Sequence, residues 1–147
     1  MELIIGGAHQ GKEEYASALY PEGKGYKWIR AGAGLEDTEC ALADLAAEKL
    51  AEADLIYGYQ EIVRRQQALG SDPVSEMERL IAIRPDIVIV CDELGCGVVP
   101  MDPADRAYRE AVGRTMCLAA QKADRVTRLF CGIATVIKDS GINERLS

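Results

Sequence analysis

A glycine-rich segment near the start of the chain has the residue types and the spacing needed to hold phosphate groups. Gly6 and Gly11 bracket four residues, and Lys12 follows directly. The four residues between the glycines are Gly7, Ala8, His9 and Gln10. Glycines let the backbone curl so that successive N–H groups face a phosphate, and the lysine reaches the outer phosphates. We therefore expect residues 6–13 to bind a nucleotide, with Lys12 as a catalytic residue. The alternative is an ordinary glycine-rich turn between a strand and a helix.

The residue after Lys12 departs from the usual phosphate-loop pattern. A serine or threonine at this position binds Mg²⁺ through its hydroxyl group, but the chain has Glu13. A carboxylate can bind Mg²⁺ directly, although it also adds a negative charge beside a triphosphate. At about 4 Å and an effective dielectric constant of about 20, this repulsion is about 4 kcal/mol when no metal intervenes. We expect Glu13 to be a Mg²⁺ ligand, and nucleotide binding to be weakened, strongly metal-dependent or lost.

Two further acidic residues follow the clearest strand of the sequence. Residues 86–91 carry apolar side chains on both faces, which is typical of a central strand in a parallel sheet. P-loop proteins place a metal-coordinating or water-orienting acid at the end of such a strand. We therefore predict Asp92 as a second Mg²⁺ ligand and Glu93 as a catalytic residue. The alternative is a solvated acidic turn.

Three arginines lie on one predicted helix that follows. Arg106, Arg109 and Arg114 fall within a helix from Asp102–Pro103 to about Ala123. Arginine binds phosphate through paired N–H groups, so these residues could clamp a phosphoryl group or a substrate. The alternative for each is a place on a solvated helix face.

The elements that must position these residues alternate along the chain. Strands are predicted over residues 1–5, 26–30, 86–91, 126–131 and 135–138. Helices are predicted over residues 13–19, 37–54, 56–69, 73–82 and 103–123. Asp37 or Thr38 would cap the second helix, and Asp72 the fourth. This alternation predicts an α/β fold with a mostly parallel sheet flanked by helices, built as a single domain over residues 1–147.

The composition of the chain argues against several classes of partner and binding site. The net charge of −7 argues against general nucleic-acid binding, which depends on neutralised phosphates. The sequence has no apolar run near the length of a membrane span, so we expect no membrane partner. The five cysteines fit no zinc-binding spacing, and a reducing cytoplasmic setting suits them best.

Several segments together resemble a known family. Ile4–Lys12 is similar to an opening strand and loop with G-G-A-R-S-G-K-S, and Val88–Pro100 to V-x-N-E-V-G-x-G-I-V-P. Arg106–Arg114 is similar to R-x-F-R-D-x-x-G-R. Ala119–Val126 and Cys131–Ile133 are similar to A-x-x-A-D-x-V and S-G-I. These motifs, in this order, resemble the adenosylcobinamide kinase / adenosylcobinamide-phosphate guanylyltransferase family of cobalamin biosynthesis.

The resemblance implies a RecA-like P-loop NTPase fold that uses Mg²⁺ and ATP or GTP. It also implies phosphorylation of adenosylcobinamide, GMP transfer onto that phosphate, a corrinoid as partner and a homo-oligomer, by family a trimer. The family accepts GMP on a histidine in the segment H-H-K-D-G-R-P, which has no counterpart here, because His9 is the only histidine. We therefore expect a kinase that lacks the family's route to guanylyl transfer. The alternative is a non-catalytic relative that binds a nucleotide or corrinoid in regulation or assembly.

Overall fold

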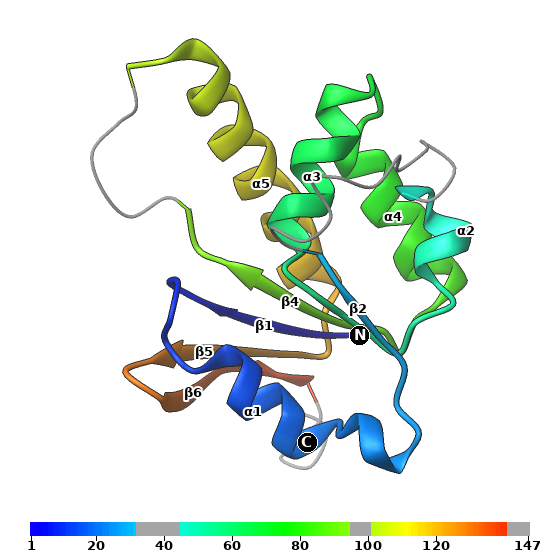
Figure 1. The fold of residues 1–147 in the computed structure, drawn as a ribbon, viewed down its shortest axis with the longest axis vertical. Coiled ribbons are helices and arrows are strands. Elements are labelled where there is room, and N and C mark those ends of the chain that lie inside the picture. Colours follow the sequence, from blue (N-terminus) through cyan, green and yellow to red (C-terminus); the bar gives the residue numbers. More distant parts are fainter. Residues whose placement is uncertain (32–44, 95–100, 141–147) are drawn as a thin grey trace.

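The central feature of the fold is a twisted sheet of six strands in the order β2-β3-β4-β1-β5-β6 (Figure 1). The computed structural model describes residues 1–31, 45–94 and 101–140. The strands are β1 (Glu2–Gly6), β2 (Trp28–Arg30), β3 (Leu55–Tyr57), β4 (Val88–Asp92), β5 (Arg125–Phe130) and β6 (Ile133–Asp139). The first five are parallel to their neighbours, and β6 pairs antiparallel with β5. The predicted α/β class with a mostly parallel sheet is confirmed.

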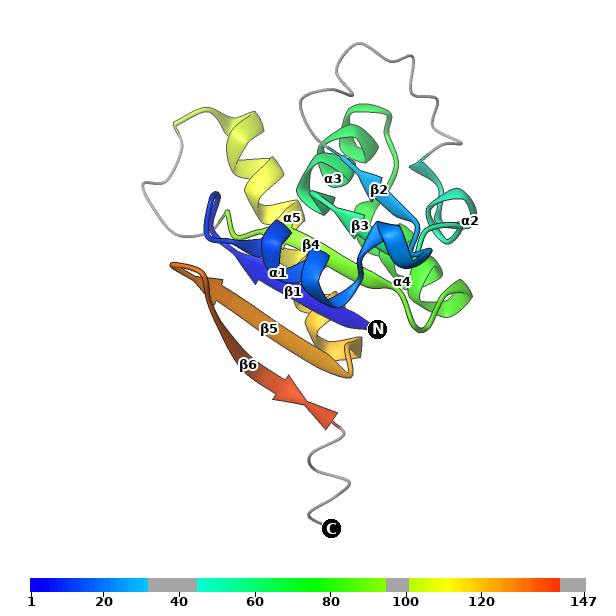
Figure 2. The same ribbon diagram turned by 60° about the horizontal axis from the view of Figure 1, so that its bottom comes forward.

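Helices cover both faces of this sheet (Figures 1 and 2). They are α1 (Lys12–Leu19), the 3-10 turn η1 (Glu22–Lys24), α2 (Ala47–Leu50), α3 (Tyr59–Ala68), α4 (Pro73–Ile83) and α5 (Pro103–Lys122). Successive residues of a strand point to opposite faces, so β1 contributes to two cores. Leu3 packs in the core beneath α2–α5, whereas Ile4 packs with Ala16 of α1 in the other. Among the described helices, none combines the length and apolar character needed to cross a bilayer.

The structure corrects two of the predicted helices. The helix predicted over residues 56–69 is in fact β3 followed, after Gly58, by α3. A run of three apolar residues is too short for periodicity to separate a strand from the first turn of a helix. The helix predicted over residues 37–54 is reduced, in its described part, to the single turn of α2. Its predicted caps, Asp37 and Thr38, lie outside the described residues.

The two helices predicted to begin with Asp–Pro are confirmed, and in each the aspartate caps the first turn. Asp72 accepts a hydrogen bond from the N–H of Val74 at 3.2 Å, and Asp102 accepts one from Ala104 at 2.9 Å. Each proline occupies the first helical position, where a missing N–H costs nothing. The long α5 packs against α4 and α3 and returns the chain to β5.

Asp54 connects three segments at the end of the sheet opposite the carboxyl ends of the parallel strands. Its carboxylate accepts a hydrogen bond from the N–H of Lys27 at 2.7 Å and forms an ion pair with Arg84. Arg84 also donates to the carbonyl of Ala53 at 3.0 Å and to Asp86 at 2.8 Å. The Lys27 N–H and then the Arg84 guanidinium lower the pKa of Asp54. Asp54 therefore stabilises the entry into β2 and the link between β3 and α4.

We expect Asp54→Asn to lower the free energy of unfolding by about 1 kcal/mol at pH 7, because a charge-assisted hydrogen bond is replaced by a neutral one. Because the folded pKa of Asp54 is depressed, its contribution is present above about pH 4 and is lost as the pH falls through the folded value. Urea unfolding at several pH values measures this.

The control for this measurement is Asp86→Asn. Asp86 also pairs with Arg84, but its side chain is 76% exposed, so a smaller effect is expected. Equal stability of wild type and Asp54→Asn at pH 7 would show that the charge of Asp54 contributes nothing to the free energy of unfolding.

Candidate phosphate-binding site

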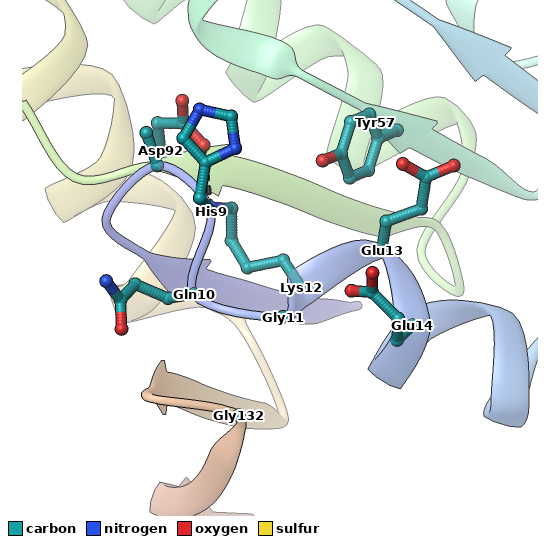
Figure 3. Close-up of a pocket in the computed structure, with 10 residues that line it drawn as sticks. His9, Gln10, Gly11, Lys12, Glu13, Glu14, Tyr57, Asp92 and Gly132 are labelled. Carbon is teal, nitrogen blue, oxygen red and sulfur yellow. Dashed lines mark ion pairs between the residues drawn. The ribbon is translucent and has the colours of Figure 1, made fainter.

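The loop between β1 and α1 lies at the carboxyl ends of the parallel strands, where ligands of open α/β sheets bind. It borders a cavity of about 470 Å³ (Figure 3). The loop contributes Ala8, His9, Gln10, Gly11, Lys12 and Glu13 to this cavity. Asp92 from the end of β4 and Tyr57 from the end of β3 complete much of the lining. The structure thus brings together most of the predicted loop residues and both predicted metal ligands, Glu13 and Asp92.

Two glycines of the loop are required by its geometry. A Cβ atom at Gly6 would lie 2.7 Å from the carbonyl oxygen of Leu129, because β5 runs close beside β1 there. Gly11 has φ of 96°, in the left-handed region, and stands immediately before α1. The first residues of α1 line the cavity, and the N-terminus of a helix suits an anion.

Lys12 is buried beneath the loop, with only 3% of its side chain exposed. Its Nζ donates a hydrogen bond to the carbonyl of Gly7 at 2.7 Å and lies 2.7 Å from Oδ1 of Asp92. The N–H of Asp92 in turn donates to Oε1 of Gln60 at 3.0 Å. An ammonium group has three N–H donors, so these two contacts leave one for a phosphate oxygen.

Glu13 is paired with a residue that the sequence analysis does not identify. Its Oε1 lies 3.3 Å from Nη1 of Arg30, at the end of β2. Arg30 also pairs with Glu22 at 2.5 Å and lies over the ring of Trp28, 4.3 Å from its centroid. Arg30 offsets part of the negative charge that Glu13 adds beside the loop. The only feature of the sequence that points to Arg30 is its position at the end of a predicted strand. Whether this strand end lies next to α1 depends on the order of strands in the sheet.

An aromatic pair joins β2 and β3, and one of its members, Tyr57, lines the cavity. Trp28 and Tyr57 stack with their ring centroids 6.3 Å apart and their planes 18° apart. Burial first, and the nearby carboxylates of Glu13 and Asp92 second, raise the pKa of Tyr57. Its hydroxyl therefore stays protonated at neutral pH and can donate a hydrogen bond into the cavity.

The two predicted Mg²⁺ ligands border the same cavity but have other partners. Glu13 contacts Arg30, and Asp92 contacts Lys12. In the described residues, no group of three or more His, Cys, Asp or Glu side chains is arranged to hold a metal. Mg²⁺ commonly binds through one or two carboxylates together with substrate phosphates. The donor set fits an ion that arrives with a phosphate ligand, and not one held by the protein alone.

Glu93 lies on the other side of Asp92. It forms a two-pronged ion pair with Arg128 of β5, at 2.8 Å and 3.0 Å. It borders a second cavity of about 310 Å³, lined mostly by apolar side chains between the sheet and α5. Arg109 and Asp92 border the same cavity, so Asp92 is shared by both.

The other two predicted arginines lie elsewhere on α5. Arg114 is 72% exposed and pairs with Glu110 at 2.5 Å, beside the start of α4. Arg106 is exposed near the beginning of α5. Within the described residues, Arg109 is thus the one arginine of the three that lines the second cavity together with Asp92. Residues 95–100, which complete the second motif, lie outside the described residues.

Comparison with known proteins identifies a family. A sequence model of the cobinamide kinase / cobinamide phosphate guanyltransferase family matches residues 53–137, more than half of the chain. The match spans Asp92, Glu93 and the three arginines; the phosphate loop precedes it. Among curated proteins, none matches the chain. The family is one of P-loop NTPases, in agreement with the loop after β1. The chain therefore belongs to the cobinamide kinase / cobinamide phosphate guanyltransferase family.

Proposed function

We propose that this protein binds ATP or GTP through residues 6–13 and transfers the terminal phosphoryl group to adenosylcobinamide. The observation that carries the proposal is the buried Lys12, held between the loop carbonyl of Gly7 and Asp92. Family membership supports an enzyme of cobalamin biosynthesis that uses a nucleotide. The kinase half of the family's activity is our assignment.

In this scheme, the loop and Lys12 carry most of the catalysis by position and charge. The N–H groups of residues 6–13 cradle the phosphates, and Lys12 neutralises the charge that develops on the moving phosphoryl group. Asp92 and Glu13 would hold Mg²⁺, which neutralises phosphate charge when bound. For this, Glu13 must leave Arg30, and Asp92 must share its charge with Lys12.

The second cavity supports a site for the acceptor. Glu93 and Arg109 border it, next to the shared Asp92. We assign Glu93 to orienting the acceptor hydroxyl group and Arg109 to holding a phosphate of the substrate or product. For Arg106 and Arg114, the role of clamping a phosphoryl group or a substrate stays a prediction, since both lie elsewhere on α5. From the family resemblance we also propose a single domain, a cytoplasmic location and a homo-oligomer, as a trimer.

The alternative is a non-catalytic relative that binds a nucleotide or a corrinoid. It is supported by Glu13 in place of a hydroxyl residue and by the pairing of both predicted Mg²⁺ ligands with basic side chains. An assay with labelled ATP and GTP, Mg²⁺ and adenosylcobinamide separates the two: label in the corrinoid supports the kinase, and saturable binding without transfer supports the alternative.

We expect Lys12→Ala to weaken binding of Mg²⁺-ATP or Mg²⁺-GTP by about 2 kcal/mol, about thirtyfold in Kd, because a charge-assisted contact with the phosphates is lost. Calorimetric titration measures the change. Lys24→Ala, in the exposed turn η1, is the matched control and should bind as wild type does. A wild-type protein that binds neither nucleotide nor inorganic phosphate saturably would rule out the proposed site.

We expect Arg30→Met to raise the Kd for ATP without Mg²⁺ by about two- to fivefold, because exposed ion pairs contribute at most about 1 kcal/mol. The loss of Arg30 leaves the carboxylate of Glu13 uncompensated beside the phosphates. In a Glu13→Gln background, Arg30→Met should have little effect. An equal loss in both backgrounds would mean that Arg30 acts independently of Glu13.

We expect no covalent GMP–histidine intermediate. His9 is the only histidine, and it lies on the phosphate loop with φ of 60°. Covalent transfer needs a nucleophile placed for in-line attack on the α-phosphate, whereas this loop grips phosphates from beneath. Incubation with α-labelled GTP and Mg²⁺, followed by denaturation, should leave the protein unlabelled. Acid-labile label in wild type that is absent from His9→Ala would refute this expectation.

A further inference from the structure

We infer that Gln10 is a positioning residue that fastens the phosphate loop to the hairpin formed by β5 and β6. Its side-chain Oε1 accepts a hydrogen bond from the N–H of Cys131 at 2.6 Å. Its backbone carbonyl accepts a second from the N–H of Gly132 at 2.9 Å. Two consecutive N–H groups of the hairpin tip thus bind one residue of the loop, across 121 positions of sequence.

The hairpin tip has the geometry to offer both donors. Cys131 and Gly132 form a two-residue connection between Phe130 and Ile133, which pair in the ladder. Their φ values are 51° and 77°, so both are left-handed, as in a type I′ turn. The ladder bond of such a turn uses the flanking residues and leaves the two central N–H groups available. Here both point at Gln10.

The tip also contacts the residue that begins the following helix. A Cβ atom at Gly11 would lie 3.2 Å from Cα of Gly132, so the two backbones are almost in contact. Gly132 itself lines the cavity and lies below Gln10 and Gly11 in Figure 3. The loop is therefore fixed from two sides: by the hairpin on the outside and by Lys12, through its bond to Gly7, on the inside.

Fixing the loop in advance favours binding. A loop that orders only when a ligand arrives loses conformational entropy at that moment, and this loss reduces affinity. The side-chain bond of Gln10 is the part of the fastening that depends on residue type, because the bond from Gly132 goes to a backbone carbonyl. The effect of the Gln10 side chain on affinity rests on the proposed nucleotide binding, whereas the hydrogen bond between Gln10 and Cys131 does not.

The contact is tested by amide hydrogen exchange, followed by NMR on the ¹⁵N-labelled protein without ligand. In Gln10→Ala, exchange of the Cys131 amide should accelerate by about tenfold relative to wild type, because its acceptor is lost. In Gln10→Glu, a carboxylate oxygen can take the place of Oε1, so protection should be retained. The Gly132 amide should change less than that of Cys131 in Gln10→Ala. Unchanged exchange at Cys131 in Gln10→Ala would overturn the inference.

The effect on binding is tested with Mg²⁺-ATP and inorganic phosphate as probes. Gly132→Ala strains the tip through its positive φ without a clash, since a Cβ there has open space around it. Both Gln10→Ala and Gly132→Ala should raise Kd by about three- to tenfold, since each removes part of one fastening contact. The double variant should lose less affinity than the sum of the two single losses, because in Gln10→Ala the strained tip has only the Gly132 bond to the backbone carbonyl left to disturb.

Fully additive losses in the double variant would show that the Gln10 side chain acts independently of the hairpin, which would overturn the positioning role. A wild-type protein without affinity for any of these probes would refute the proposed function, whereas the exchange rate of Cys131 would still decide whether the contact exists.

Discussion

A buried ammonium group needs a partner, and the pairing of Lys12 with Asp92 determines much of what surrounds it. The parallel ladder between β1 and β4 places Asp92 opposite Gly6, and Lys12 begins α1 after the loop that follows Gly6. A slip of one residue would turn the carboxylate to the other face of the sheet and leave a buried, uncompensated charge. The register of these two strands, the glycine at the end of β1 and the start of α1 are therefore linked through a single ion pair.

Two further ion pairs at this end of the sheet resemble the pair of Lys12 and Asp92. Around the carboxyl ends of the strands, Asp92 pairs with Lys12, Glu13 with Arg30 and Glu93 with Arg128. The first pair joins β4 to α1, the second joins α1 to β2, and the third joins the residue after β4 to β5. In a chain with a net charge of −7, these pairs offset part of the negative charge at the site, although Glu14 adds a further carboxylate to the cavity. An anionic ligand must therefore reorganise existing pairs, and a divalent cation that arrives with it lowers the cost.

The features that sequence analysis identifies here are those encoded within a few consecutive residues. The phosphate loop, the acid at the end of β4 and the Asp–Pro helix starts all belong to this class. The strand β3 is missed because three apolar residues carry no periodicity of their own. Two contacts, Arg30 with Glu13 and Gln10 with Cys131, depend on strand order and on a hairpin far along the chain. The local segments that form the candidate site are thus readable from sequence, whereas the groups that restrain them require the tertiary structure.

Trp28 occupies a special place in this arrangement, because it is the only tryptophan of the chain. One face of its indole ring stacks with Tyr57, which borders the cavity, and the guanidinium of Arg30 lies over the ring. A cation close to an indole changes the emission of that ring. Any event that draws Arg30 away from Glu13, or that moves Tyr57, therefore alters the surroundings of a single fluorophore. The emission of Trp28 would therefore report directly on the ion pair between Arg30 and Glu13.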